Sequence, residues 1–586
     1  MDIQSLCIIE PLSCWAVNLS PPDSEARTGC EIPFLWMCLV TPKKQDGKIF
    51  GFAEFVQAFA LLLLVYTLSD TRYRFRLAIS PIPLFRWTYY ACALIGVGTL
   101  ATDIWFTHSL PLPSYLADQL LWQAVFGITF LGVALIWMRY AFIRPAIFGK
   151  RNAEKFARTI YSYIVRGSNT ELPIIASELI VSAQSIVAFV KEYNGSDPSE
   201  TVTPGRIAHE VMLLMGSRTF CRHVIMSSPG TAIAFFTEMS RQKSPALSMS
   251  QFASNISTEA VLNKDSLLYH EDSGYYSGLL GYIKPFSKAV YGDWTLVETL
   301  AQNRSPLDIS WDDRSGWDAP KLEAYCRVVL ITFENYLANN GWHQHSYALY
   351  RAFHSIEHAC SDLTNLDGLS EYYKRDENHR LEVVLRFIQD AIKLLDKYKL
   401  VPRKLRQRET NGPMQDDYYD TIAKMYFELV LRGGYLKGPP ETCWGIQHNG
   451  IWYALFSLHS GRALEIVRFK VRRLIYDEIL CLQDFPNFKS SRILGFCLAV
   501  MGVKIGSKKG FGKEEYAIRK AVVSWCKHNF QTLHKAQPFV AETCLLGSIS
   551  FDKESGHLIR TYARNLDLTP RQDILELDPA KPNPNQ

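Results

Sequence analysis

Three long apolar segments lie in the first quarter of this 586-residue chain, and they restrict its fold more than any other feature. They occupy residues 50–68, 87–107 and 119–143. Each approaches or exceeds the ~20 residues that an α-helix needs to cross the hydrocarbon core of a bilayer. The remainder, from residue 144 onward, has the composition of water-soluble protein and is long enough for two or three domains. The sequence therefore predicts a three-helix transmembrane bundle followed by a large soluble region.

The basic residues between the spans predict an orientation. Arginines follow the first span at Arg72, Arg74, Arg76 and Arg86, and basic residues follow the third span from Arg139 to Arg158. Residues 104–118 contain no lysine or arginine. Because basic residues collect on the cytoplasmic side, we expect a multi-pass protein of the cell (inner) membrane, with its N-terminus outside and its C-terminal part in the cytoplasm. Lys43, Lys44 and Lys48 favour the opposite orientation.

Two of the spans carry polar or small residues on one helical face. In the first span these are Glu54 and Gln57, and in the second they are Cys92, Gly96, Thr99 and Asp103, spaced four, three and four residues apart. Acidic side chains at membrane depth are costly unless they meet water or a partner. If the bundle is repeated around a symmetry axis, these residues are candidates to line a cation-attracting pore. Alternatively, both acids lie at the membrane interface and the bundle is an anchor.

Hydrophobic periodicity in the soluble part is helical, and alternating strands are scarce. The segments with this periodicity are 152–166, 171–192, 206–226, 320–338, 346–361, 370–398, 417–432, 462–483 and 513–532. The predicted fold class is all-α. The expected division is an extracytoplasmic segment 1–49, a transmembrane domain 50–143, a membrane-proximal helical domain 144–310, a helical sensor domain 311–565 and a mobile tail 566–586.

The thirteen cysteines include no CxxC pair. Cys7, Cys14, Cys30 and Cys38 precede the first span, where two disulfides are possible if that side is oxidising. The eight from Cys221 to Cys544 are expected to be ordinary buried thiols.

A histidine cluster at residues 343–360 contains the pattern HxxEH, formed by His354, Glu357 and His358. On a helix the two histidines are one turn apart and could share a zinc ion, with Glu357 polarising a bound water. The pattern resembles the zinc motif of inverted metallopeptidases, which also implies a third ligand about 70–80 residues onward. Glu428 is the nearest candidate for that ligand. Structural or surface histidines are the alternative.

Two pairs, Arg218 with His223 and Arg351 with His358, fit the R-x4-6-H spacing. The spacing resembles that of HEPN ribonucleases, all-helical proteins in which such a pair acts on the scissile phosphate. A random chain of this composition contains about two such matches, so the pattern alone says little.

Basic residues concentrate in three stretches of the soluble part. They are Lys393, Lys397, Lys399, Arg403, Lys404, Arg406 and Arg408; then Arg468 and Arg472; and finally Lys508, Lys509 and Lys513 in a glycine-containing loop. Such a loop can bind phosphate through its backbone amides, although its spacing is not that of a Walker A motif. We expect either solvated surfaces or sites for anionic lipid, a nucleotide or an oligonucleotide.

This order of a small membrane bundle and a large helical cytoplasmic domain resembles the membrane effectors of bacterial anti-phage defence. The resemblance is one of architecture and covers the whole chain. It implies a homo-oligomeric channel or membrane-disrupting effector in the lipid bilayer, gated by a nucleotide or nucleic-acid signal that a partner enzyme makes. The alternative is a membrane-tethered hydrolase, either zinc-dependent or HEPN-like.

Overall fold

The computed structural model describes most of the chain. The described residues are 32–34, 37–41, 49–68, 70–113, 116–193, 203–243, 247–271, 276–277, 281–282, 284–309, 316–403, 416–456, 461–506, 513–562 and 570–580. The chain divides into two compact units, Met1–Ala146 and Ile147–Gln586.

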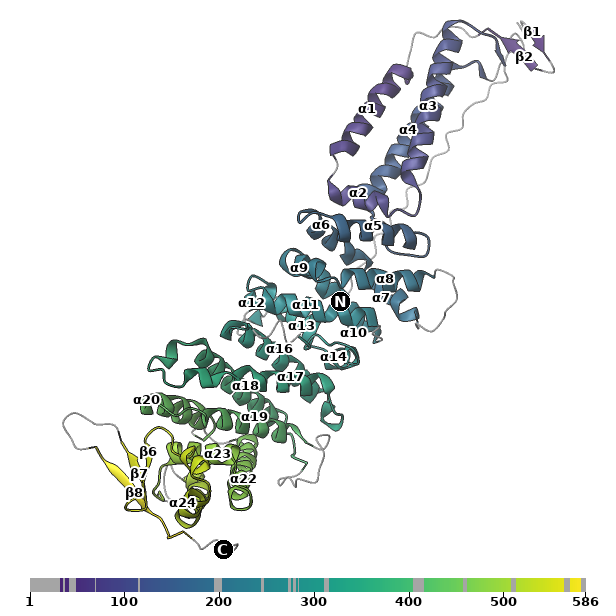
Figure 1. The fold of residues 1–586 in the computed structure, drawn as a ribbon. Helices are drawn as coiled ribbons and strands as arrows, with labels where there is room; N and C mark the ends of the chain where they lie inside the picture. Colours follow the sequence, from purple (N-terminus) through teal and green to yellow (C-terminus); the bar gives the residue numbers. More distant parts are fainter. Residues whose placement is uncertain are drawn as a thin grey trace, which may run out of the picture. The chain divides into compact units, whose positions relative to one another are not determined.

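The first unit contains the predicted apolar helices (Figure 1). They are α1 (Phe52–Leu68), α3 (Leu84–Thr107) and α4 (Gln119–Met138), which continues as the π-helical turn η2 (Arg139–Ile143). A further helix, α2 (Thr71–Ala78), occupies what the sequence indicated to be a loop. It begins at Asp70, whose carboxylate accepts the Thr71 N–H at 2.7 Å.

Among the residues that the structure describes, three helical segments are long and apolar enough to cross a membrane: α3, residues Gln119–Ile143, and residues Glu171–Glu192. Helices α1 and α2 meet the same test as a pair bent by 105°. Residues 171–192 belong to the second unit, where Ile175, Leu179 and Val187 are fully buried. We therefore assign this segment to the helical domain, and α1, α3 and α4 to the membrane bundle.

The arginines of the bundle gather at one end. Helix α2 packs against η2, where Arg76 donates to the Ala141 carbonyl at 3.0 Å and the rings of Tyr73 and Phe142 are 4.4 Å apart. At the other end, strand β2 (Met37–Val40) pairs antiparallel with β1 (Ile32–Phe34) and with β3 (Leu112–Pro113). The residues before α1 thus pair with the connection between α3 and α4.

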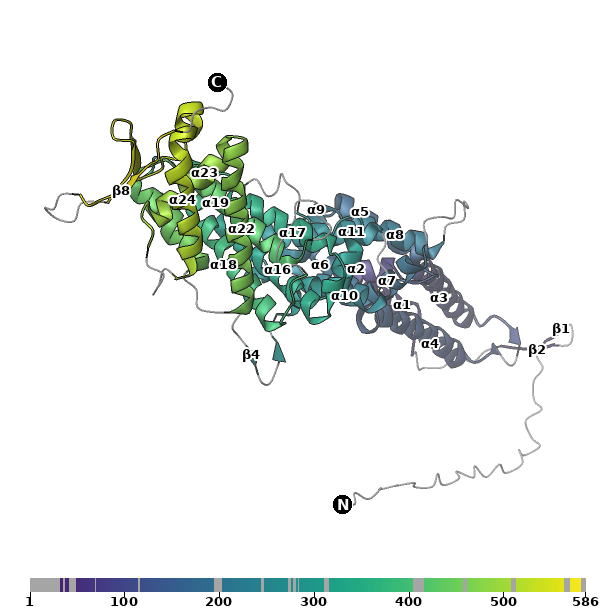
Figure 2. The ribbon, with the colours of Figure 1, turned by 90° about the horizontal axis from the view of Figure 1, so that it is seen from below.

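The second unit is built from stacked helices, each packed mostly on helices near it in the chain (Figures 1 and 2). Its first half contains α5 (Ala153–Arg166), α6 (Glu171–Glu178), η3 (Leu179–Ser182), α7 (Ala183–Glu192), α8 (Pro204–Met215), α9 (Arg218–Ser227), α10 (Pro229–Gln242), α11 (Leu247–Leu262), α12 (Leu267–His270), the short strands β4 (Tyr276–Ser277) and β5 (Gly281–Tyr282), α13 (Pro285–Tyr291) and α14 (Trp294–Leu300).

The second half continues with α16 (Ala319–Ala338), η4 (Gly341–His343), α17 (Tyr347–Glu357), η5 (His358–Cys360), η6 (Leu363–Leu366), η7 (Tyr372–Lys374), α18 (Asp376–Lys397), α19 (Tyr418–Gly433), α20 (Pro440–Cys443), η9 (Trp444–Trp452), α21 (Tyr453–Phe456), α22 (Arg462–Asp484), α23 (Phe488–Met501), α24 (Lys513–Ala536) and α25 (Pro538–Glu542). Strands β6 (Ile549–Asp552), β7 (His557–Thr561) and β8 (Gln572–Glu576) form an antiparallel sheet in that order. The all-α prediction is confirmed, with this sheet as the main addition.

Two sequence-based expectations need correction. The segment 206–226 is two helices rather than one, because α8 ends at Met215 and Ser217 caps α9 by accepting the Phe220 N–H. Part of the predicted mobile tail forms β8, in which Ile574 lies opposite Ile559 of β7. The predicted membrane-proximal and sensor domains lie within one compact unit, where α13 and α14 pack on α16.

Candidate functional site

Among the described residues, a polar pocket of the second unit gathers arginines from three separate segments. Its basic side chains are Arg218 at the start of α9, Arg304 in the connection after α14, and Arg351 and His354 on α17. The opening has a volume of about 1480 Å³ including its mouth, and its polar lining includes Asn255, Thr258, Asn303 and Ser355. We call this the arginine pocket.

A buried carboxylate fixes one wall of the arginine pocket. Glu259 of α11, only 1% exposed, accepts Arg218 Nε at 2.6 Å and Arg222 Nε at 2.9 Å. It also accepts Asn263 Nδ2 at 3.1 Å. Arg218 keeps 44% of its side chain exposed. Charge-assisted hydrogen bonds of this kind hold a guanidinium in a fixed orientation at the wall of a pocket.

The opposite wall is organised by Asp308. This carboxylate accepts Arg351 Nη2 at 2.8 Å, and Arg351 also donates to the Ala301 carbonyl at 3.0 Å. The same carboxylate accepts the Ser305 N–H at 2.7 Å. Arg304 lies in the same loop as Ser305 and Asp308. It is exposed and pairs with no carboxylate among the described residues. The pocket lining therefore carries three arginines against one acid, Asp308.

Aromatic and imidazole rings complete the arginine pocket. Tyr350 is 42% exposed, and its ring centroid lies 6.5 Å from that of His354. The Nε2 atoms of His354 and His358 are 3.3 Å apart. An exposed tyrosine beside arginines offers a stacking surface for a nucleobase next to a phosphate-binding site.

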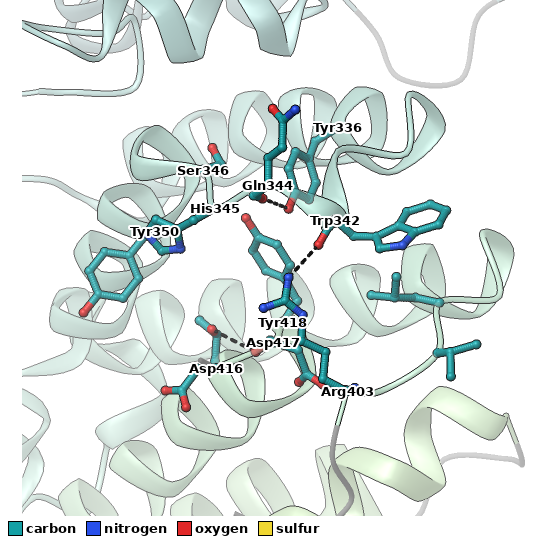
Figure 3. A pocket seen from close by; sticks show the side chains of 13 residues that line it. Tyr336, Trp342, Gln344, His345, Ser346, Tyr350, Arg403, Asp416, Asp417 and Tyr418 are labelled. Atoms are coloured by element: carbon teal, nitrogen blue, oxygen red, sulfur yellow. Dashed lines mark hydrogen bonds between the residues drawn. The ribbon is translucent and has the colours of Figure 1, made fainter. Parts of the chain in front are cut away.

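Two neighbouring pockets adjoin the arginine pocket. One lies along α14 and shares Arg351, and the other, shown in Figure 3, shares Tyr350. In the latter, Tyr336 donates to the Gln344 carbonyl at 2.7 Å and Arg403 donates to the Trp342 carbonyl at 3.1 Å. Its acids, Asp416 and Asp417, make it less suited to an anion than the arginine pocket.

The predicted zinc motif places two ligands together but not a third. His354 and His358 face each other, whereas among the residues that the structure describes no third His, Cys, Asp or Glu joins them. Burial raises the pKa of Glu357, and the charge of His354 opposes that effect. Glu428, the predicted third ligand, pairs with Arg432 at 2.8 Å.

The two R-x4-6-H pairs are divided by the fold. Arg218 and Arg351 line the arginine pocket, but His223 does not line it. Burial, followed by the charge of Arg222, lowers the pKa of His223. The structure thus combines one arginine from each pair in a single pocket, together with His354, which the second pair did not include.

The predicted basic stretches do not form one site. Lys393 pairs with Asp390 at 2.7 Å, Lys397 pairs with Glu334 at 2.5 Å, and the left-handed backbone of Lys399 (φ 49°) follows the end of α18. Arg468 is 4% exposed and donates to the Leu455 carbonyl at 2.8 Å, while Arg472, one turn further along α22, is partly exposed. Lys404, Arg406, Arg408, Lys508, Lys509 and the side chain of Lys513 lie outside the described residues.

In the bundle, the predicted pore-lining residues divide between packing and capping. Cys92, Gly96 and Thr99 are buried, and a Cβ on Gly96 would lie 2.8 Å from the Phe55 ring of α1. In the single chain Gly96 therefore packs against α1, and Cys92 belongs to the same buried cluster as Phe55. Gln57 is exposed.

Both membrane acids meet at the start of α1. Asp103 accepts the Phe52 N–H at 3.0 Å and Glu54 accepts the Gly51 N–H at 2.9 Å. Gln123 of α4 accepts the Ile49 N–H at 2.8 Å and contacts the Phe50 N–H at 3.4 Å. The two acids stabilise the amino end of a helix, where negative charge is favourable.

Of the cysteines that were candidates for disulfides, Cys7, Cys14 and Cys30 lie outside the described residues, and only the backbone of Cys38 is described. The eight cysteines of the second unit are free thiols, buried except for Cys481.

Sequence reasoning missed Arg304, Asn255 and Asn303, because single polar residues in distant segments form no local pattern. Comparison of this chain with protein-family models, curated proteins and solved structures found no match.

Proposed function

We propose that this chain is a multi-pass membrane protein whose helical domain binds a phosphate-bearing ligand, a nucleotide or an oligonucleotide, in the arginine pocket. The observation that carries the proposal is the convergence of Arg218, Arg304 and Arg351 against one lining carboxylate. Guanidinium groups recognise phosphate oxygens through paired N–H donors, so three of them in one pocket favour a ligand with more than one negative charge.

The rest of the lining favours a nucleotide over a simple inorganic anion. Tyr350 supplies an aromatic face, and Asn255 and Asn303 supply amides that can donate to and accept from a base edge. Because Glu259 and Asp308 already hold two of the arginines, little side-chain entropy is lost when a ligand binds.

In this proposal the three-helix bundle forms an oligomeric channel or membrane-disrupting effector, and ligand binding in the helical domain gates it. Three helices cannot enclose an aqueous pore alone, so a pore requires several chains around an axis. Glu54 and Gln57 are exposed and become the candidate pore residues. The arginines at one end of the bundle support a cytoplasmic location for that end.

The binding test uses the full-length protein in detergent, with a fluorescent ATP analogue and a short single-stranded oligonucleotide as probes. Arg304→Glu is expected to weaken binding of at least one probe about tenfold or more, because loss of a phosphate contact of about 1.4 kcal/mol changes affinity tenfold. Arg158→Glu is the matched control, since Arg158 is 81% exposed and pairs only with Glu154 on α5. Unchanged affinity in Arg304→Glu, or no binding of either probe, contradicts the proposal.

The channel part is tested separately by ion flux from vesicles that contain the reconstituted protein. We expect flux that changes when the probe that binds is added. If the protein binds a probe but conducts no ions with or without that probe, the proposed ligand binding stands and the proposed channel is wrong.

A second function, phosphodiester hydrolysis, is favoured by the position of His354 beside Arg351 in the same pocket. There the arginines would hold the phosphate and His354 would transfer a proton. RNA cleavage that is lost in His354→Ala and kept in His379→Ala, a half-exposed histidine of α18, would support this reading. Metal analysis of wild type and His358→Ala tests the zinc-dependent version.

A further inference from the structure

A large apolar cleft lies between α1 and α3 in the first unit. The two helices meet near the start of α1, where Phe55 packs on Gly96 and Phe52 donates to Asp103. Beyond that contact, the cleft occupies about 1500 Å³ including its opening. Its apolar lining includes Phe59, Leu62, Phe85, Ala93 and Val97.

One end of the cleft is polar and carries a positive charge. Arg74 of α2 lines this end, together with Tyr66, Thr88 and Tyr89. Arg74 Nη2 donates to the Thr67 carbonyl in the last turn of α1 at 3.0 Å. Within the part of the chain that is described, no carboxylate pairs with Arg74. The guanidinium therefore retains donors for an anion at the mouth of an apolar cleft.

The length of the cleft corresponds to one leaflet of a bilayer. On α3 its lining runs from Leu84 to Val97, and a rise of 1.5 Å per residue makes this stretch roughly 20 Å long. The hydrocarbon core of a bilayer is ~30 Å thick, or about 15 Å per leaflet. The polar end coincides with the arginine-rich end of the bundle, which the positive-inside rule places next to the leaflet that holds anionic lipids.

We propose that this cleft binds an anionic phospholipid, with an acyl chain along α1 and α3 and the phosphate at Arg74. An acyl chain fits because the lining is apolar and open to the hydrocarbon, and a negative headgroup fits because Arg74 has no acidic partner among the described residues. This site is separate from the arginine pocket; it rests on the proposed membrane location and orientation of the bundle and not on ligand binding by the helical domain.

The experiment is native mass spectrometry of the full-length protein in detergent, with added phosphatidylglycerol or phosphatidylcholine. We expect one phosphatidylglycerol per chain to be retained, at least about fivefold more than phosphatidylcholine. Ala93→Trp fills the cleft and is expected to reduce retention about fivefold or more. Ala101→Trp, on an exposed position of α3 that does not line the cleft, is the control.

The headgroup contact is tested by Arg74→Gln, with Arg72→Gln as its control on the same helix. Arg74→Gln should abolish the preference for phosphatidylglycerol, and Arg72→Gln should leave it unchanged, because Arg72 does not line the cleft. Equal retention of both lipids by the wild type, or unchanged retention in Ala93→Trp, overturns the proposal. A wild-type dimer that Ala93→Trp converts to a monomer also overturns it, because a second copy would then occupy the cleft.

Discussion

Lys470 of α22 and Asp420 of α19 form a buried ion pair. Removing the lysine charge tests how much this pair contributes to the stability of the helical domain. Their side chains are 5% and 7% exposed. Lys470→Met keeps the aliphatic stem and leaves the Asp420 carboxylate buried without its cation. Breaking a buried pair in this way costs about 3–5 kcal/mol. Because Asp420 still accepts the Asp417 N–H at 3.2 Å, we expect a loss near 3 kcal/mol, the lower end of that range.

The assay is thermal unfolding of the full-length protein in detergent. An unfolding entropy of about 2.1 cal/mol/K per residue over ~440 residues gives roughly 0.9 kcal/mol/K, so a loss of 3 kcal/mol lowers Tm by about 3 °C. The control is Lys424→Met, which removes the partner of Asp416. That lysine is 47% exposed, so its loss should cost at most about 1 kcal/mol.

The cost should also depend on pH. Burial raises the pKa of Asp420, and Lys470 opposes that rise. In Lys470→Met the folded-state pKa of Asp420 lies further above its unfolded value. The folded variant therefore binds this proton more strongly than the unfolded chain does, and it loses stability as pH rises through the interval between the two pKa values. The Tm deficit of Lys470→Met relative to wild type should therefore be largest near pH 8 and shrink toward pH 5. A deficit below about 1 °C, or one that grows on acidification, would refute the reasoning.

Two further predictions concern the bundle. Gly96→Leu should lower the Tm of the bundle, because its Cβ would lie 2.8 Å from the Phe55 ring. Gly132→Leu should be tolerated, because apart from its chain neighbours and the backbone of its own helix no atom of the described chain lies within 4 Å of the corresponding Cβ. Gln123→Leu removes the acceptor of two backbone N–H groups, which should cost about 1–3 kcal/mol and raise amide hydrogen exchange at Ile49 and Phe50 about tenfold, as measured by mass spectrometry. Unchanged exchange there would show that these N–H groups have other acceptors.

The sequence predicted the structure best for helices that bury only one face and for long apolar segments. The three spans could be placed within a few residues because length and hydropathy define them. Likewise, Phe156 and Ile160 of α5 recur every four residues and are fully buried. Helix α23 was missed because it is buried on all sides, so its residues show no amphipathic period. Helix α2 was missed because eight residues with three arginines look like a polar loop.

The candidate site was harder to predict for a different reason. Arg218 and Arg351 could be named from their spacing to histidines, but nothing in the chain indicates that they share a pocket. That pocket exists because Glu259 and Asp308 orient arginines from helices far apart in the sequence. The basic runs were the stronger local signal, yet Lys393 and Lys397 pair with nearby acids, as exposed helical lysines commonly do.

The hydrogen bonds at the start of α1 have a consequence for how the bundle is assembled. Two of the acceptors, Asp103 and Gln123, belong to helices that the ribosome makes later. In hydrocarbon an unsatisfied N–H is costly, so α1 would enter the bilayer with its leading amides still hydrated near the interface. Helix α1, which is synthesised before α3 and α4, can therefore complete its hydrogen bonding only after both of those helices have been made.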